Sequence, residues 1–99
     1  PATIQANTGC HFTKLPRGNF RSVEYYEFTN NSCATAELDN ILAYIDTYFV
    51  GGIVPLVGCV YRFTGANMGI PSAAGLVSRT SIIGKYAAAG KTCAIYVNP

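Results

Sequence analysis

The chain has 99 residues, of which 49% are hydrophobic, 12% are aromatic and only 12% are charged, with a net charge of +2. This composition supplies apolar material for one domain over residues 1–99, which excludes a disordered chain, and too little basic charge for a nucleic-acid-binding protein. A soluble domain usually carries charge on about a quarter of its residues, so part of the apolar material is expected to contact something outside the molecule, with a membrane surface as the leading candidate.

The first third of the chain is predicted to form a β-hairpin. One strand is expected over Gly9–Lys14 and a second, rich in aromatic residues, over Arg21–Phe28. The proline and glycine of Leu15–Asn19 are typical of the turn between them. The second strand has large apolar residues on both faces, which predicts burial on both sides or a β-bulge: Val23 with Tyr25, and Tyr26 with Phe28.

A helix is expected next, starting at a cap supplied by Asn31 or Ser32 and ending at Gly51 and Gly52. Glu37 lies near its positive end, where the helix dipole favours an acidic residue. Apolar residues recur at helical spacing on one face, which indicates packing on a sheet: Ala34, Leu38, Ile41, Leu42, Ile45 and Phe49.

The second half of the chain alternates strand and helix. Ile53–Thr64 is expected to lead into a strand, with Pro55 outside the sheet. A second helix is expected over Ser72–Ala89, with Pro71 at its first position or just before the cap, and a last strand over Thr92–Val97. Each strand has one apolar face: Cys59, Tyr61 and Phe63 in the first, and Cys93, Ile95 and Val97 in the second.

The predicted order is therefore strand, strand, helix, strand, helix, strand. This order is typical of an α+β fold, a two-layer α/β sandwich in which two helices cover one face of an antiparallel or mixed four-stranded sheet.

Four widely spaced cysteines favour two disulfides over a zinc site, because there is no C-x-x-C pair and only one histidine. The predicted topology ranks Cys10–Cys33 with Cys59–Cys93 first among three connectivities. Disulfides imply a secreted protein, and a chain that begins at Pro1 is expected to have lost its secretion signal. Buried free thiols remain the alternative.

Residues that could perform catalysis are few, and none falls in a recognised catalytic or nucleotide-binding motif. The best enzymatic case is a small secreted ribonuclease, with His11 and either Glu24 or Glu27 as acid and base and Arg21 on the phosphate. The sequence favours no enzyme, no metal and no cofactor.

The second helix is amphipathic but weakly charged, and we expect one of two uses for it. It either packs on the sheet as ordinary core or lies in a membrane interface, alone or as an oligomer. Its small residues would allow helices to approach closely there. The apolar, charge-free Thr47–Tyr61 would add a sticky surface. The apolar side is predicted to hold Ala73, Leu76, Thr80, Ile83 and Ala87, with Val77 and Tyr86 beside them.

The segment Gly69–Lys91 (GIPSAAGLVSRTSIIGKYAAAGK), in a short chain with an α/β pattern, resembles the virally encoded yeast killer toxins. The resemblance implies a secreted antifungal toxin without a catalytic centre, which docks to a cell-wall polysaccharide or mannoprotein and then permeabilises the fungal plasma membrane.

The same resemblance implies roles for side chains of the second helix. Four apolar residues would enter lipid and three basic residues would face headgroups: Leu76, Val77, Ile83 and Tyr86, and Arg79, Lys85 and Lys91. Exposed tyrosines could stack on sugars, with Tyr25, Tyr26, Tyr44 and Tyr48 as candidates. The alternatives to a membrane toxin are the ribonuclease, a ligand of a receptor or channel, and a host-directed fungal effector.

Overall fold

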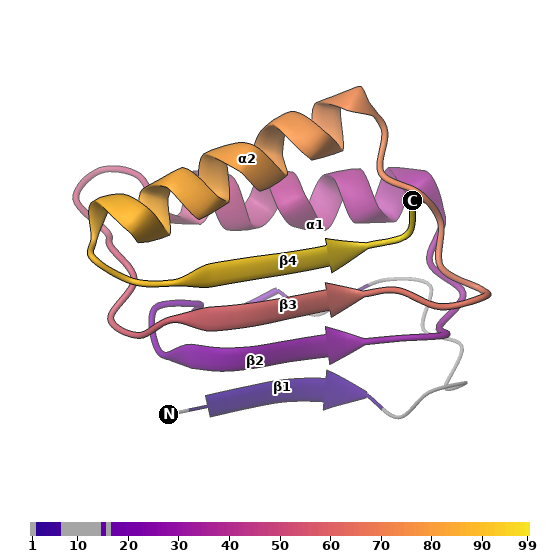
Figure 1. Ribbon diagram of the computed structural model, residues 1–99, viewed down its shortest axis with the longest axis horizontal. Coiled ribbons are helices and arrows are strands. Elements are labelled where there is room, and N and C mark those ends of the chain that lie inside the picture. The colour runs from indigo at the N-terminus through magenta and orange to yellow at the C-terminus, as the bar shows by residue number, and fades with distance from the viewer. Residues whose placement is uncertain (1, 7–14, 16) are drawn as a thin grey trace.

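The computed structural model describes residues 2–6, 15 and 17–99, and it shows two helices and four strands among them. The elements are β1 (Ala2–Ala6), β2 (Val23–Phe28), α1 (Thr35–Tyr48), β3 (Cys59–Phe63), α2 (Ala73–Ala88) and β4 (Cys93–Val97). From β2 onward they follow the predicted order, whereas β1 was not predicted. Figure 1 shows the four arrows pointing the same way, with the two helices side by side. The α+β class is therefore confirmed.

The sheet is parallel throughout, so the prediction of an antiparallel or mixed sheet was wrong. Its strand order is β1-β2-β3-β4, and each neighbouring pair runs in the same direction. β2 lies between β1 and β3 and pairs with both. Gly9–Lys14, which was expected to pair with β2 in a hairpin, lies outside the described residues. Leu15 and residues 17–19 lie in the connection between the parallel strands β1 and β2.

The bulge predicted in β2 is confirmed, and it explains the mixed burial of that strand. The register passes from Ala2 opposite Val23 to Thr3 opposite Tyr25, so Glu24 is an extra residue in β2. This insertion returns Val23 to the inner face, where Tyr26 and Phe28 are also buried.

Both helices cover the same face of the sheet, because side chains from α1, α2 and the inner positions of the strands form one continuous core. α1 begins later than predicted, after the cap Ala34 rather than Asn31 or Ser32. α2 begins after Ser72, with Pro71 just before this cap, which was one of the two positions expected for Pro71. The buried face of α1 agrees with the prediction for Leu38, Ile41, Leu42, Ile45 and Phe49, whereas Ala34 is exposed.

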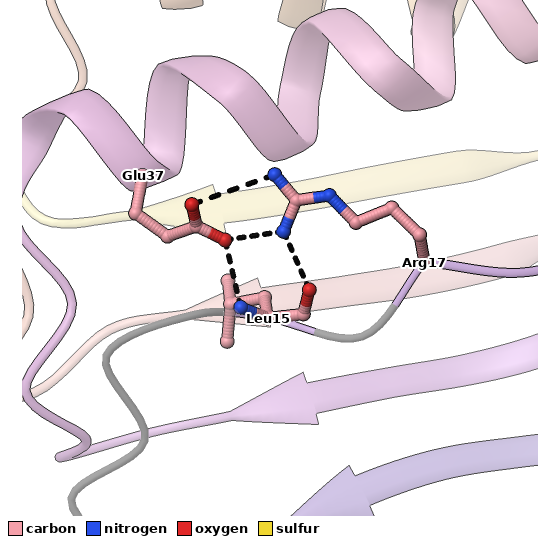
Figure 2. A network of polar contacts seen from close by, with 3 residues as sticks. All are labelled: Leu15, Arg17 and Glu37. Carbon is pink, nitrogen blue, oxygen red and sulfur yellow. Dashed lines mark hydrogen bonds and ion pairs between the residues drawn. The ribbon is translucent and has the colours of Figure 1, made fainter.

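The connection that leads into β2 also contributes to the helical layer. Leu15 and Phe20 are buried in the same core, and the Phe20 ring lies 5.5 Å from that of Tyr26. Figure 2 shows how the segment is held: Glu37 in the first turn of α1 accepts hydrogen bonds from the Leu15 amide, at 2.7 Å, and from the Arg17 guanidinium. This ion pair is partly buried, and its carboxylate also accepts a hydrogen bond from the main chain at Leu15. It therefore holds the connection more firmly than an exposed ion pair would.

Candidate functional site

The two faces of α2 differ in an unusual way. The face toward the rest of the fold buries Gly75, Ile82 and Tyr86. The face toward solvent has no charged side chain, although it lies on the surface of the molecule. Its exposed residues are small or apolar apart from one threonine: Ala73, Ala74, Leu76, Val77, Thr80, Gly84, Ala87 and Ala88.

This face is uncharged because both charged residues of α2 are drawn toward other elements. Arg79 donates from Nε to the main-chain oxygen of Ile95 in β4, at 3.0 Å. Lys85 donates from Nζ to the main-chain oxygen of Asp46 at 2.6 Å, and the same nitrogen lies 2.8 Å from the Asp46 carboxylate. The two charged side chains of α2, which would normally be solvated on a surface helix, therefore interact with β4 and α1 instead.

The apolar face is also hollowed near the start of the helix. Leu76, Val77, Thr80 and Ser81 line an open hollow of about 510 Å³. Leu76 is 42% exposed and Val77 is 71% exposed. Large aliphatic side chains with so much surface in water are free to contact an apolar partner.

Seven side chains were predicted to act at a membrane; Lys91 is exposed beyond the end of α2, and the six within α2 are divided between surface and core. Leu76 and Val77 lie on the surface, whereas Ile83 packs partly against the core. Tyr86 is fully buried, and its hydroxyl is 2.6 Å from that of Tyr61. Burial raises the pKa of Tyr86 above its usual value. The predicted lipid-facing set must therefore be corrected: Tyr86 and most of Ile83 belong to the core, and Arg79 and Lys85 have partners within the protein.

α2 is fastened to α1 at both ends by acidic residues of α1. At its start, the Asp39 carboxylate accepts hydrogen bonds from the Ser72 amide at 2.9 Å and from the Ser72 hydroxyl at 2.6 Å. Gly75 leaves room for this contact, because a Cβ atom there would lie 2.2 Å from Asp39 Oδ1. At its end, Lys85 is held by Asp46 as described above.

A second apolar surface lies on the loop between α1 and β3, within the charge-free stretch that the sequence singled out. Four large side chains on this loop are between 38% and 52% exposed: Val50, Ile53, Val54 and Leu56. Arg21 contacts this loop twice. Its Nε donates to the main-chain oxygen of Val54 at 3.0 Å, and its main-chain oxygen accepts a hydrogen bond from the Leu56 amide at 2.9 Å.

The outer face of the sheet is the third surface of interest, because no described helix covers it. Parallel sheets are usually covered on both faces, so this arrangement is uncommon. Arg62 of β3 lies between Glu27 of β2 and Tyr96 of β4 in the register, with its guanidinium carbon 4.5 Å from the centre of the Tyr96 ring and its Nε 3.9 Å from Glu27. Tyr96 is 47% exposed, and Tyr25 is partly exposed on the neighbouring strand β2.

Of the four tyrosines considered for sugar contacts, two are not freely exposed on the surface. Tyr26 is fully buried, and Tyr48 packs against the core. Tyr44 lies on the outer side of α1, with its hydroxyl 3.5 Å from Gly18 O. Tyr96 was not predicted, although the alternation of β4 already assigned it to the face opposite Ile95.

Two of the residues considered for a ribonuclease, Arg21 and Glu27, are engaged in separate contacts. His11 lies outside the described residues. Arg21 is engaged with the α1–β3 loop, whereas Glu27 lies beside Arg62 on the outer face of the sheet. Within the part of the chain that the structure describes, no group of three or more His, Cys, Asp or Glu could hold a metal ion.

Three of the four cysteines lie in the described residues, and two of them, Cys59 and Cys93, are free thiols. Cys33 and Cys59 are buried and Cys93 is partly buried, while Cys10 falls outside the described residues. In the ranges 2–6, 15 and 17–99, no helix is long and apolar enough to cross a membrane.

Comparison of the chain with protein-family models, with curated proteins and with solved structures finds no match.

Proposed function

We propose that this chain is a secreted antifungal toxin that binds the surface of the fungal plasma membrane and permeabilises it. The observation that carries the proposal is the charge-free outward face of α2, where Leu76 and Val77 are exposed beside an open apolar hollow. The fungal target and the killing activity are what the resemblance to yeast killer toxins adds.

Transfer of these side chains into lipid would supply a useful part of the binding free energy. Complete burial of a leucine or valine side chain contributes about 1.5–3 kcal/mol. Leu76 and Val77 are partly covered already, so a fraction of that amount is available from each. The exposed aliphatic side chains of the α1–β3 loop would add to it if this loop also meets the membrane.

α2 is also the helix whose release from the fold disturbs the core least. It contributes two large, fully buried side chains, Ile82 and Tyr86, and two polar attachments to α1. A helix lying in the interface must keep its polar groups satisfied, and Arg79 and Lys85 would exchange their protein partners for headgroups. The exposed small residues Gly84 and Ala88 would let copies of α2 approach closely in an oligomer on the membrane.

The outer face of the sheet supports the docking step, with a neutral cell-wall polysaccharide as the ligand. Flat aromatic rings beside paired hydrogen-bonding groups suit sugar rings, and Tyr25, Tyr96 and Arg62 lie on this one face. Glu27 offsets the charge of Arg62, so the face does not favour a phosphorylated polymer. Tyr96→Ala should weaken co-sedimentation with insoluble β-glucan or mannan about tenfold, with liposome binding unchanged.

The membrane proposal is tested by dye release from protein-free liposomes of fungal lipid composition. The double variant Leu76→Asp/Val77→Asp places two charges on the outward face of α2. The matched control Asn40→Asp/Thr47→Asp places the same charges on exposed positions of α1. We expect the first variant to lose release and yeast killing while the control keeps both.

Several results would contradict this function. Equal activity of the two double variants would remove α2 from the mechanism. Killing without dye release would indicate a receptor or channel as the target, and a folded protein that leaves fungi unharmed would favour a host-directed effector. Hydrolysis of RNA that is lost in His11→Ala would favour the ribonuclease.

A further inference from the structure

Cys59 and Cys93 occupy equivalent positions at the starts of two neighbouring strands. Each is the first residue of its strand, and the two are direct partners in the register of the β3–β4 pair. Both belong to the inner face of the sheet, because Cys59 lies two residues before the core residue Tyr61 in β3 and Cys93 lies two residues before the core residue Ile95 in β4. Their side chains therefore leave adjacent backbone positions toward the same side of the sheet.

The backbones at this point are also held close together. The Cys59 amide donates to Thr92 O at 3.1 Å, and a Cβ atom on Gly58 would lie 2.7 Å from that same oxygen. Adjacent strands are about 4.7–4.9 Å apart, which falls within the range of roughly 4.4–6.8 Å between the Cα atoms of disulfide-bonded cysteines. The register thus meets the main geometric requirement of a disulfide.

The third described cysteine cannot compete for either of these thiols. Cys33 follows β2 at the opposite end of the sheet, where its main-chain oxygen accepts a hydrogen bond of 2.8 Å from Gly69, beyond the end of β3. β3 alone separates Cys59 from that end by about 13 Å at roughly 3.3 Å per residue. A bond between Cys33 and Cys59 would require the sheet to come apart.

We propose that Cys59 and Cys93 are joined by a disulfide that cross-links β3 to β4 in the folded protein. A disulfide of the oxidised glutathione class accepts the two electrons. One cysteine thiolate attacks it and releases one glutathione thiolate, and the second cysteine thiolate then attacks the mixed disulfide and releases the other. The two protons lost by the cysteines are taken up by the two glutathione thiolates.

The burial of these thiols indicates when the bond forms. Burial raises the pKa of Cys59 to about 12, although hydrogen bonds with Tyr61 and Tyr86 oppose the rise, and burial together with the neighbouring Cys59 raises the pKa of Cys93 to about 12. Since the thiolate is the attacking species, the folded and reduced protein exchanges slowly. The cross-link is therefore made during folding and is then protected by the core.

The position of the bond has a consequence for α2, which connects β3 to β4. The disulfide closes the chain into a loop over residues 59–93 that contains the whole helix. β3 and β4 then stay adjacent when α2 leaves the sheet. This inference does not depend on the membrane activity, because the bond is detected chemically whether or not the protein kills.

The test is to refold the reduced protein in a buffer of reduced and oxidised glutathione and to map its disulfides by mass spectrometry. Digestion after Arg, Lys and Glu separates Cys33 from Cys59 and yields the peptides Leu38–Arg62 and Thr92–Pro99, each with one cysteine. We expect these two peptides to be linked, and to separate on reduction. The Cys93→Ala variant is the control, in which Leu38–Arg62 should be fully alkylated by iodoacetamide.

A second measurement reports on the folded state. In a Cys10→Ala variant, a reductant should lower the Tm by roughly 10 °C, because it opens the closed loop. The proposal is overturned if the wild-type peptides are recovered separately with both thiols alkylated, or if Cys59 is linked to Cys10 or Cys33. It is equally overturned if the Tm of the variant does not respond to the reductant.

Discussion

The two helices lie side by side in one layer and run in the same direction, yet they are attached to the fold in different ways. α1 is held by burial, since four of its side chains are inaccessible to solvent: Leu38, Ile41, Leu42 and Ile45. α2 has a single fully buried aliphatic side chain, Ile82, together with Tyr86, and its outward face is apolar and uncharged.

The polar contacts follow the same division. The acidic side chains of α1 each hold another segment of the chain: Glu37 holds the segment at 15–17, Asp39 holds the start of α2, and Asp46 holds its end. α1 thus organises the helical layer, and α2 is attached to it. The difference suggests that α1 is the stable centre of the domain, whereas α2 is the element able to change partners.

The largest expected effect separates the buried face of α1 from the exposed face of α2. Leu42→Ala should lower the free energy of unfolding by about 3 kcal/mol, because it leaves a cavity in the core. Leu76→Ala removes a similar side chain from the surface and should change it by less than about 0.5 kcal/mol. Urea denaturation measures both, and equal losses would show that α2 is as deeply packed as α1.

Two glycines of α2 offer a sharper test of how the helix is attached. Gly75→Ala should destabilise the protein by about 1 kcal/mol, since the new Cβ displaces the Asp39 carboxylate and outweighs the gain in helix propensity. Gly84→Ala meets no atom within 4 Å and should stabilise it by about 1 kcal/mol. The Tm should therefore fall in Gly75→Ala and rise in Gly84→Ala. Shifts of the same sign would contradict the close contact at Gly75.

The contact between Asp39 and Ser72 can be removed without adding any atom to α2. Asp39→Ala should lower the free energy of unfolding by about 1 kcal/mol, the usual cost of a lost helix cap. If α2 must leave α1 to act on lipid, the same variant should release liposome contents faster than the wild type. Slower release by a folded Asp39→Ala protein would indicate that α2 acts while it is attached.

The last comparison concerns pH and the thiols beside α2. Because burial raises the pKa of Cys59 and Cys93 to about 12 from the ordinary thiol value near 9, the reduced fold gains stability below about pH 9 and loses it as the pH rises toward 12. The oxidised protein lacks this titration, so its Tm should fall less between pH 8 and pH 11. Parallel pH profiles for the two forms would contradict the burial of these thiols.

Much of the layout was predictable, because period and turn chemistry are local signals. The buried face of α1 follows from its helical spacing, and β3 and β4 follow from alternation. The N-terminal strand was missed, since Ala2–Ala6 is short and its parallel partner is far away in the chain. The proline and glycine at 15–19 are equally compatible with a hairpin turn and a crossover.

The buried side of α2 could not be read from the sequence for a different reason. Ile82 and Ile83 are adjacent and equally apolar, so periodicity does not decide which of them is buried. The orientation of α2 is instead set by contacts with other elements. Tyr86 contacts Tyr61, Arg79 donates to the main chain at Ile95, and Lys85 donates to the main chain at Asp46. Such pairings depend on tertiary structure, and of the four apolar residues considered for lipid contact the structure exposes Leu76 and Val77.

The central claim, that the outward face of α2 meets the membrane, is most directly tested with single tryptophans, because the chain contains none. Val77→Trp reports on α2, and Tyr44→Trp reports on the exposed side of α1. With liposomes of fungal lipid composition, the account predicts that only the emission of the Val77→Trp protein moves to shorter wavelength and is quenched by brominated lipids. A response of Tyr44→Trp with none from Val77→Trp, or no response from either while dye is released, would contradict it.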